Sequence, residues 1–286
     1  MDVDEFAPGL SFFFAATTNL FEEVAKFRAA RRLYARIMRE RFNAKKPESM
    51  KLKFHVQTSG AALTAQQPEV NIIRTTIQAL AAVLGGAQSL HVNAYDEALA
   101  LPTERSVKLA LRVQQVIAYE SGVIDSIDPL GGSYYIEWLT DTIEEEVMKI
   151  IDYVDKLGGM TKAVEIGYPQ RAIAESAYQY QKMVEEGRIA VIGVNMFREE
   201  EGLHIELHKV DPVSRERSIR RAREVRESRD REAWERAING LRRAADKEDE
   251  NIFPYILSAV KAKATIGEIS GVLRDVWGEY KPPSIY

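Results

Sequence analysis

The chain has 286 residues, of which 45% are hydrophobic and 29% are charged, and its formal net charge is −4. This composition supports a buried core, so we expect a globular protein of one or two domains. The absence of cysteine excludes disulfides, thiolate metal sites and cysteine nucleophiles. No stretch approaches the ~18 apolar residues that span a bilayer, and the acidic N-terminus lacks a signal-peptide pattern. We therefore expect a soluble, cytoplasmic protein that does not bind membranes.

The first 120 residues or so alternate strand-like runs with helical patterns, which is typical of βα units and a parallel sheet. The predicted strands cover residues 10–16, 51–58 and 89–94. A predicted helix follows each strand, over residues 20–42, from after Pro68 to Leu84, and from about Thr103 to before Gly122. The apolar stripe of the second helix consists of Ile73, Ile77, Leu80, Ala81 and Leu84. Asn19 and Thr103 are predicted caps, with Ser106 as an alternative to Thr103.

Beyond Asp125 the pattern changes to mostly helical sequence, at about 137–157, 169–186 and 212–277. The last of these stretches is dense in charge, and its arginine-rich part, residues 214–232, carries acidic residues among the arginines. This balance predicts a solvated, ion-paired helix and no binding of nucleic acid. We place a domain boundary near Asp125, between residues 1–124 and a helical region at 125–286.

Each predicted strand has one apolar face and one mixed or polar face. On the second strand, Lys51, Lys53, His55 and Gln57 alternate with Leu52, Phe54 and Val56. The polar faces of the other two strands carry Ser11, Phe13 and Ala15, and Ser89, His91 and Asn93. Strands covered on both faces normally read as continuous apolar runs, so the helices are expected on the apolar face only. The polar face then looks either into solvent or into a lumen that holds a polar ligand.

Several long blocks resemble the large (alpha) subunit of the adenosylcobalamin-dependent acyl-CoA mutases, methylmalonyl-CoA mutase above all. These blocks are APGLSFFFAATTNLFEEVAKFRAARRLYA, FHVQTSG, LTAQQPEVNIIRTTIQALAAVLGGAQSLHVNAYDEALALPTE, ESGVIDSIDPLGGSYYIE and LGGMTKAVEIGYPQRAI. The resemblance implies an α/β fold, with the last three βα units of a TIM (β/α)8 barrel followed by a mostly helical C-terminal region. It implies no cobalamin-binding domain, and no D-x-H-x-x-G cobalt-ligand motif occurs in the sequence.

Three parallel strands do not close a barrel, and free sheet edges favour association, so we expect the chain to need a partner. The resemblance implies that the assembly is a hetero-oligomer. The resemblance implies two protein partners, a chain carrying the N-terminal barrel strands and a small cobalamin-binding subunit. The wording TAQQPEVN at residues 64–71 is also similar to relatives whose cobalamin domain is a separate subunit. A natural split subunit and a fragment remain alternatives at this point.

The resemblance implies an isomerase, an intramolecular transferase that is active only with its partner chains. The expected reaction is the radical 1,2-rearrangement that interconverts methylmalonyl-CoA and succinyl-CoA, with adenosylcobalamin held mainly by a partner. A closed barrel protects such a radical from solvent. The alternatives are a sister mutase acting on isobutyryl-CoA, 2-hydroxyisobutyryl-CoA or ethylmalonyl-CoA, and a non-catalytic structural paralogue.

Site residues follow from positions that match the family's motifs. The catalytic residues implied are His55 and Gln57, and the substrate-binding residues are Ser11, Phe13, His55 and Gln57. The implied cofactor-binding residues are Gln57, Gly60, Asn93 and Glu97, and His91 and Gln88 are expected to support the site. His204 and His208 have the spacing of a helical pair, but two ligands without a third predict no metal site.

Three positions depart from the family pattern. Gly9 stands where relatives usually carry an arginine that contacts the coenzyme A phosphates, and Glu48 stands near the place of a channel-mouth lysine. Ala61 replaces a frequent tryptophan against the corrin. These departures bear on phosphate-end affinity and corrin contact, and they leave the non-catalytic paralogue open.

Overall fold

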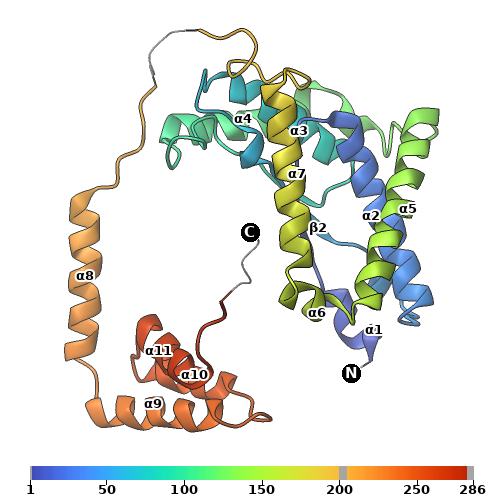
Figure 1. The fold of residues 1–286 in the computed structure, drawn as a ribbon. Coiled ribbons are helices and arrows are strands. Elements are labelled where there is room, and N and C mark those ends of the chain that lie inside the picture. Colours follow the sequence, from blue (N-terminus) through green and yellow to red (C-terminus); the bar gives the residue numbers. More distant parts are fainter. Residues whose placement is uncertain (1, 200–204, 282–286) are drawn as a thin grey trace. The chain divides into compact units, whose positions relative to one another are not determined.

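The computed structural model describes residues 2–199 and 205–281, and the chain divides into two compact units between His208 and Lys209 (Figure 1). The predicted α/β class is confirmed as a mixed, mostly helical fold with one small parallel sheet. The boundary expected near Asp125 lies inside the first unit. Within the described residues, no helix combines the length and the apolar character needed to cross a membrane.

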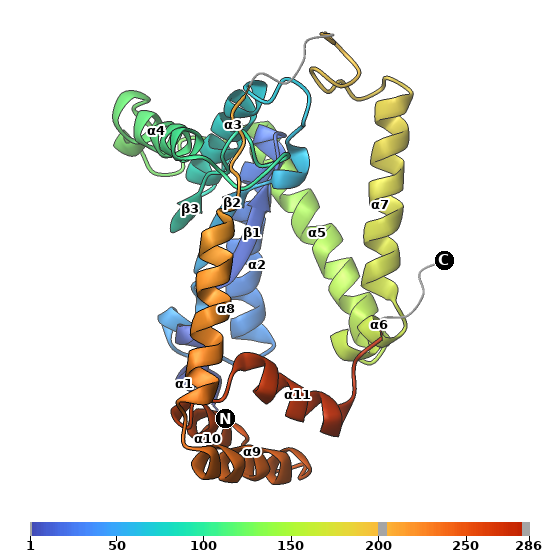
Figure 2. The same cartoon turned by 90° about the vertical axis from the view of Figure 1, so that its left-hand side faces the viewer.

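Three parallel strands form the sheet, in the order β1-β2-β3 (Figure 2). They are β1 (Phe12–Ala16), β2 (Phe54–Thr58) and β3 (Ser89–His91), each shorter than the predicted run. The register places His55 between Phe13 and Ser89. Side chains that alternate along one strand therefore form rows across the sheet.

A helix follows each strand, as predicted. These helices are α2 (Leu20–Glu40), α3 (Val70–Leu84) and α4 (Glu104–Glu120), and shorter turns are α1 (Val3–Phe6), η1 (Ala7–Gly9), η2 (Pro47–Met50), η3 (Gly60–Ala62) and η4 (Val123–Asp125). The Thr103 hydroxyl caps α4 by accepting from the backbone N–H of Ser106 at 3.2 Å. Asn19 stands at the N-cap of α2, but its side chain donates to Glu22 and caps no backbone group.

The helices cover the apolar face of the sheet. Phe54 and Val56 are buried on that face, and Phe27 of α2 stacks on Phe54 with ring centroids 5.4 Å apart. Phe14 meets both rings edge-on. Aromatic packing of this kind buries much apolar area and holds α2 against the strands. The two-faced character predicted for the strands is therefore confirmed.

The predicted apolar stripe of α3 is wrong at Ile73, whose side chain is 62% exposed. The buried side of α3 instead combines small apolar residues with four polar ones, namely Asn71, Arg74, Thr75, Gln78, Ala79, Ala81 and Ala82. Alanines let the helix approach the sheet closely, and Asn71, Arg74 and Gln78 donate hydrogen bonds to nearby loops, whereas Thr75 donates to the Ile72 carbonyl oxygen of its own helix. The helix is therefore rotated from the orientation that its large aliphatic residues predict.

The helix α5 (Tyr134–Lys156) packs along α2, so the first unit continues past Asp125. Arg28 of α2 donates to Glu137 at 2.8 Å and to the Thr140 hydroxyl at 3.1 Å, and Arg41 pairs with Asp155 at 2.6 Å. The helices α6 (Met160–Glu165) and α7 (Tyr168–Glu185) follow. These contacts between α2 and α5 keep α5 in the first unit, so the two units do not divide near Asp125.

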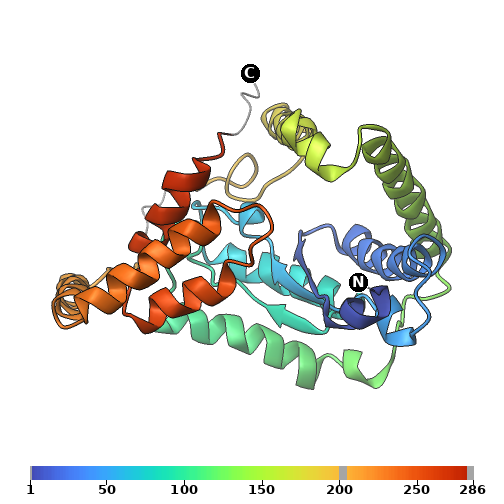
Figure 3. The ribbon, with the colours of Figure 1, turned by 90° about the horizontal axis from the view of Figure 1, so that it is seen from below.

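The second unit contains α8 (Pro212–Glu227), α9 (Arg231–Ala245), α10 (Phe253–Lys261) and α11 (Ile266–Trp277). The last three, orange to red in Figure 3, pack around Leu241, Ala259 and Val272. Nearly all side chains of α8 are exposed, and Arg220 and Glu224 pair along it at 3.9 Å. The prediction of a solvated, ion-paired helix is confirmed.

Candidate functional site

The sheet face opposite α2 and α3 carries a row of three neighbouring side chains. Phe13 is 63% exposed, and its ring lies 5.1 Å from the imidazole of His55. The Nδ1 of His55 shares a hydrogen bond of 2.7 Å with the Ser89 hydroxyl. Among the described residues, no group bonds to the Nε2 of His55. The row therefore presents an aromatic surface beside one unsatisfied ring nitrogen.

A second row lies toward the carboxyl ends of the strands. The Gln57 side-chain amide donates to the side-chain oxygen (Oδ1) of Asn93 at 2.7 Å. Asn93 is 1% exposed and is held twice by Thr58, whose hydroxyl accepts from its backbone N–H at 2.8 Å and whose carbonyl accepts from its side chain at 2.9 Å. Because Asn93 is fixed from both ends, it fixes the orientation of Gln57 in turn.

Gly60 and Glu97 also lie at the carboxyl ends of the strands, and we call the group of Gly60, Asn93 and Glu97 the carboxyl edge. Gly60 opens η3 after β2, and a Cβ built on it would lie 3.2 Å from the Asn93 amide nitrogen and 3.6 Å from Cγ of Glu97. Glu97 is exposed. The structure therefore places Gly60, Asn93 and Glu97 side by side, with Gln57 bonded to Asn93. Parallel strands bring such groups together because their carboxyl ends share one sheet edge.

The structure does not bring Ser11 to this edge. Ser11 precedes β1 by one residue, at the opposite end of the strands, and is exposed. Gly9 is likewise exposed, with no atom within 4 Å of a Cβ built on it. Glu48 is exposed and pairs with Lys51 at 3.3 Å, and Ala61 is exposed. The space around Gly9 is therefore no obstacle to a larger residue.

The sequence did not predict two supporting contacts, namely those of Ser89 with His55 and of Thr58 with Asn93. The strand register decides these contacts, because it places Ser89 opposite His55. The alternation along β3 shows only that Ser89 lies on the same face as His91. Gln88 has a structural role, because its side-chain oxygen accepts from the backbone N–H of Phe54 at 2.7 Å. His91 is exposed and in register with Gln57.

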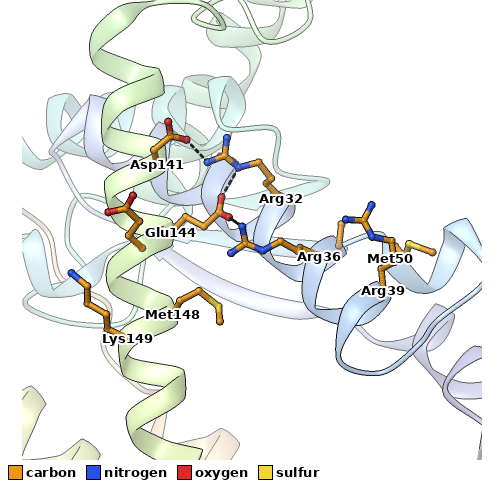
Figure 4. Close-up of a pocket in the computed structure, with 10 residues that line it drawn as sticks. Arg32, Arg36, Arg39, Met50, Asp141, Glu144, Met148 and Lys149 are labelled. Carbon is orange, nitrogen blue, oxygen red and sulfur yellow. Dashed lines mark hydrogen bonds and ion pairs between the residues drawn. The ribbon is translucent and has the colours of Figure 1, made fainter.

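An open pocket between α2 and α5 is a separate feature that none of these residues lines (Figure 4). Arg32 pairs with Asp141 and Glu144 across it, and Arg36 pairs with Glu144 at 2.5 Å. The pocket therefore belongs to the ion-paired contact between the two helices.

His204, which has helical spacing with His208, lies outside the described residues. Among residues 2–199 and 205–281, no three His, Asp or Glu side chains are grouped to hold a metal ion.

Polar groups thus converge at the carboxyl ends of a parallel sheet, and comparison with known proteins gives the family. The family model of methylmalonyl-CoA mutase matches residues 1–279. The chain is 51% identical over its whole length to a 2-hydroxyisobutanoyl-CoA mutase large subunit of Aquincola tertiaricarbonis. It is 43% identical to a methylmalonyl-CoA mutase of Rhizobium meliloti (strain 1021) and 42% identical to the mitochondrial methylmalonyl-CoA mutase of Homo sapiens, over 98% of the chain in each case. The chain therefore belongs to the methylmalonyl-CoA mutase family.

The relatives are mutases, a kind of isomerase, and they are longer than this chain. The chain spans 51% of the Aquincola protein, 39% of the Rhizobium protein and 38% of the human protein. The expected resemblance to acyl-CoA mutases is confirmed at the level of the family.

Proposed function

We propose that this chain forms part of the catalytic barrel of an acyl-CoA mutase. In this proposal β1, β2 and β3 are the last three strands of a TIM (β/α)8 barrel, and a partner chain supplies the earlier strands. The observation that carries the proposal is the accessible sheet face with Phe13, His55 and Gln57, opposite a face that helices cover. When partner strands enclose this face its polar groups lose contact with water and need another partner, which a polar acyl-CoA thioester supplies.

His55 and Phe13 are the proposed contacts of the acyl group. The Nδ1 of His55 and the Ser89 hydroxyl share a hydrogen bond. In this proposal the hydroxyl is the donor, so the imidazole has its proton on Nε2, and Nε2–H donates a hydrogen bond to the thioester carbonyl oxygen. The Phe13 ring, 5.1 Å from the imidazole, packs against the acyl carbons. Gln57, fixed by Asn93, orients the reacting group at the inner end of the row. Ser11 lies at the other end, where coenzyme A enters in this proposal.

The carboxyl edge fits an adenosyl group. Because Gly60 lacks a Cβ, a ligand can approach its backbone beside Asn93 and Glu97. The Glu97 carboxylate and the Asn93 amide are suited to bind ribose hydroxyls. Adenosylcobalamin, when bound, supplies the radical that starts a 1,2-rearrangement. We propose that a small cobalamin-binding subunit carries most of this cofactor.

Two substrates compete within the proposal. Methylmalonyl-CoA, interconverted with succinyl-CoA, is the substrate that the family name suggests. The 51% identity to a 2-hydroxyisobutanoyl-CoA mutase large subunit, against 42–43% to two methylmalonyl-CoA mutases, favours 2-hydroxyisobutanoyl-CoA. Assays of methylmalonyl-CoA and 2-hydroxyisobutanoyl-CoA decide between these two substrates, and isobutyryl-CoA and ethylmalonyl-CoA are assayed beside them as the remaining alternatives.

Reconstitution tests the proposal. This chain is mixed with a polypeptide carrying the earlier strands, a cobalamin-binding subunit and adenosylcobalamin, and isomerisation of each thioester is assayed. We expect activity that falls about 100-fold or more in kcat/KM in the His55→Ala, Gln57→Ala double variant, as for loss of positioned polar groups. The control double variant is His208→Ala with Gln181→Ala, which changes the same residue types at exposed positions outside the site.

Activity that persists in the His55, Gln57 double variant removes both residues from the site. An assembled complex that isomerises none of the four thioesters overturns the proposal and supports a non-catalytic scaffold.

A further inference from the structure

The helix α3 buries a row of polar side chains, which is unusual for a helix that packs on a sheet. Asn71, Arg74 and Gln78 are 0%, 8% and 0% exposed, and their spacing of three and four residues places them on one helix face. The Gln78 amide donates to the Thr18 hydroxyl, in the loop after β1, at 3.1 Å. The row therefore begins to connect α3 with loops at the carboxyl edge of the sheet.

Asn71 joins the loop after β2 to the loop after β3. Its side-chain nitrogen donates to the carbonyl oxygens of Thr64 and Tyr95, each at 2.9 Å. Its side-chain oxygen accepts from the Thr64 backbone N–H at 3.1 Å and from Arg74 at 2.8 Å. All four hydrogen bonds available to the amide are thus formed. Tyr95 lies between Asn93 and Glu97, and Thr64 lies four residues after Gly60.

Arg74 extends the same connection to a third segment. Its guanidinium donates to the Thr64 hydroxyl at 3.0 Å and to the Ile192 carbonyl oxygen at 2.7 Å. Its hydrogen-bond partners among the described residues are uncharged oxygens of Thr64, Asn71 and Ile192, and burial lowers its pKa. Burying a cation without an ion pair costs free energy. At this position the cost is offset because the planar guanidinium of Arg74 donates several hydrogen bonds in a fixed geometry.

The segment that Arg74 reaches is also attached by Gln67. The Gln67 side chain donates to the Phe197 carbonyl oxygen at 2.9 Å, and a Cβ on Gly193 would lie 3.3 Å from that side chain. Residues 192–197 therefore lie against the loop that follows β2, and Arg74 and Gln67 hold them there.

We infer that Asn71 and Arg74 are positioning residues that set the spacing between Gly60 and the Asn93–Glu97 turn, and so determine how tightly the edge binds an adenosyl group. This inference rests on the proposed function. The two residues touch no part of the acyl row formed by Phe13, His55 and Ser89. Their removal should therefore weaken binding of the cofactor and leave binding of the acyl-CoA unchanged.

The variants Asn71→Asp and Arg74→Lys test this inference. Aspartate keeps the shape and the acceptor of Asn71 and offers Arg74 a charge, but it loses both donated bonds, including the one to Tyr95. Lysine keeps the charge of Arg74 but not the fork. Matched controls are Asn251→Asp, where the side chain only accepts a hydrogen bond from Phe253, and Arg105→Lys at an exposed position.

The first readout is amide exchange in the chain without cofactor. We expect faster exchange in residues 59–66 and 94–100 of the Asn71→Asp variant, with β2 and α2 unchanged. The second is the KM for adenosylcobalamin in the reconstituted complex, which we expect to rise at least tenfold while the KM for acyl-CoA stays within twofold. Arg74→Lys should give a smaller rise.

Unchanged exchange in both loops overturns the inference. Faster exchange with a lower kcat and an unchanged KM for adenosylcobalamin also overturns it, because that pattern indicates a merely structural role. If the unaltered complex lacks mutase activity, the proposed function fails separately. In that case equilibrium binding of adenosylcobalamin to the assembled complex tests the inference, and we expect a Kd at least tenfold higher for the Asn71→Asp variant than for the unaltered chain.

Discussion

Gly60 is the residue at which adding a single methyl group should affect the carboxyl edge more than the rest of the site. A methyl group there would lie 3.2 Å from the Asn93 amide nitrogen, closer than most real contacts, so Asn93 must move by a few tenths of an ångström. Thr58 holds Asn93 from both ends, which leaves little room for that movement.

For the Gly60→Ala variant we therefore expect a several-fold rise in the KM for adenosylcobalamin and a smaller rise in the KM for acyl-CoA, because Asn93 also holds Gln57. Steady-state kinetics of the reconstituted complex measure both. Gly267→Ala is the control, since no atom lies within 4 Å of a Cβ built at that exposed helical position. Equal effects of Gly60→Ala on the two KM values would show that the two rows are not separate subsites.

At the scale of the element, the start of α11 depends on one carboxylate. Glu268 accepts two hydrogen bonds of 2.8 Å from Arg229 and closes a capping box with Thr265. These interactions, led by the bond from Arg229, lower the pKa of Glu268 from 4.5 to about 2. The guanidinium of Arg229 also lies 4.0 Å from the Trp234 ring, so α9 and α11 share this contact.

A carboxylate whose pKa is lowered on folding stabilises the folded state above its unfolded pKa. The contribution of Glu268 is therefore complete above about pH 4.5 and is lost as the pH falls toward about 2. We expect Glu268→Gln to lower the free energy of unfolding of the second unit by about 2 kcal/mol at pH 7. The difference from the unaltered chain should shrink in acid.

Urea unfolding followed by tryptophan fluorescence measures this difference across the pH range, in chains that carry Trp138→Phe so that only Trp234 and Trp277 emit. Glu232→Gln is the control, because its pair with Arg236 is almost fully exposed and surface pairs contribute little. A difference that stays constant from pH 7 to pH 2.5 would show that the ionised form of Glu268 is not what stabilises α11.

At the scale of the whole molecule, the sheet has two unpaired edges. Within the described residues, no strand pairs with the outer side of β1 or of β3. Exposed edges of parallel strands favour association with other chains. The same edges are where the proposed barrel partner would pair.

We therefore expect this chain, expressed alone, to self-associate as its concentration rises, and a polypeptide with the earlier strands to suppress the association. Sedimentation velocity with and without that polypeptide measures both effects. A monodisperse monomer whose β1 and β3 amides are fully protected from exchange would contradict the expectation.

Periodicity in the sequence was sufficient to predict the three βα units and the two faces of the strands. An alternation such as that of Phe54, His55, Val56 and Gln57 records which side of a strand is buried, and this depends only on neighbours along the chain. The same local logic located the Thr103 cap and the exposed character of α8. Motifs likewise indicated the family that the comparisons confirm.

Only the tertiary structure decided which residues meet. The rotation of α3 that exposes Ile73 depends on the alanines and polar groups that face the sheet and its loops, and periodicity alone favoured the large aliphatic residues. The bonds of Asn71 to Thr64 and Tyr95 join residues that lie 7 and 24 positions away from it. Such contacts depend on strand register and helix packing, which bring distant segments together and leave no periodic trace in the chain.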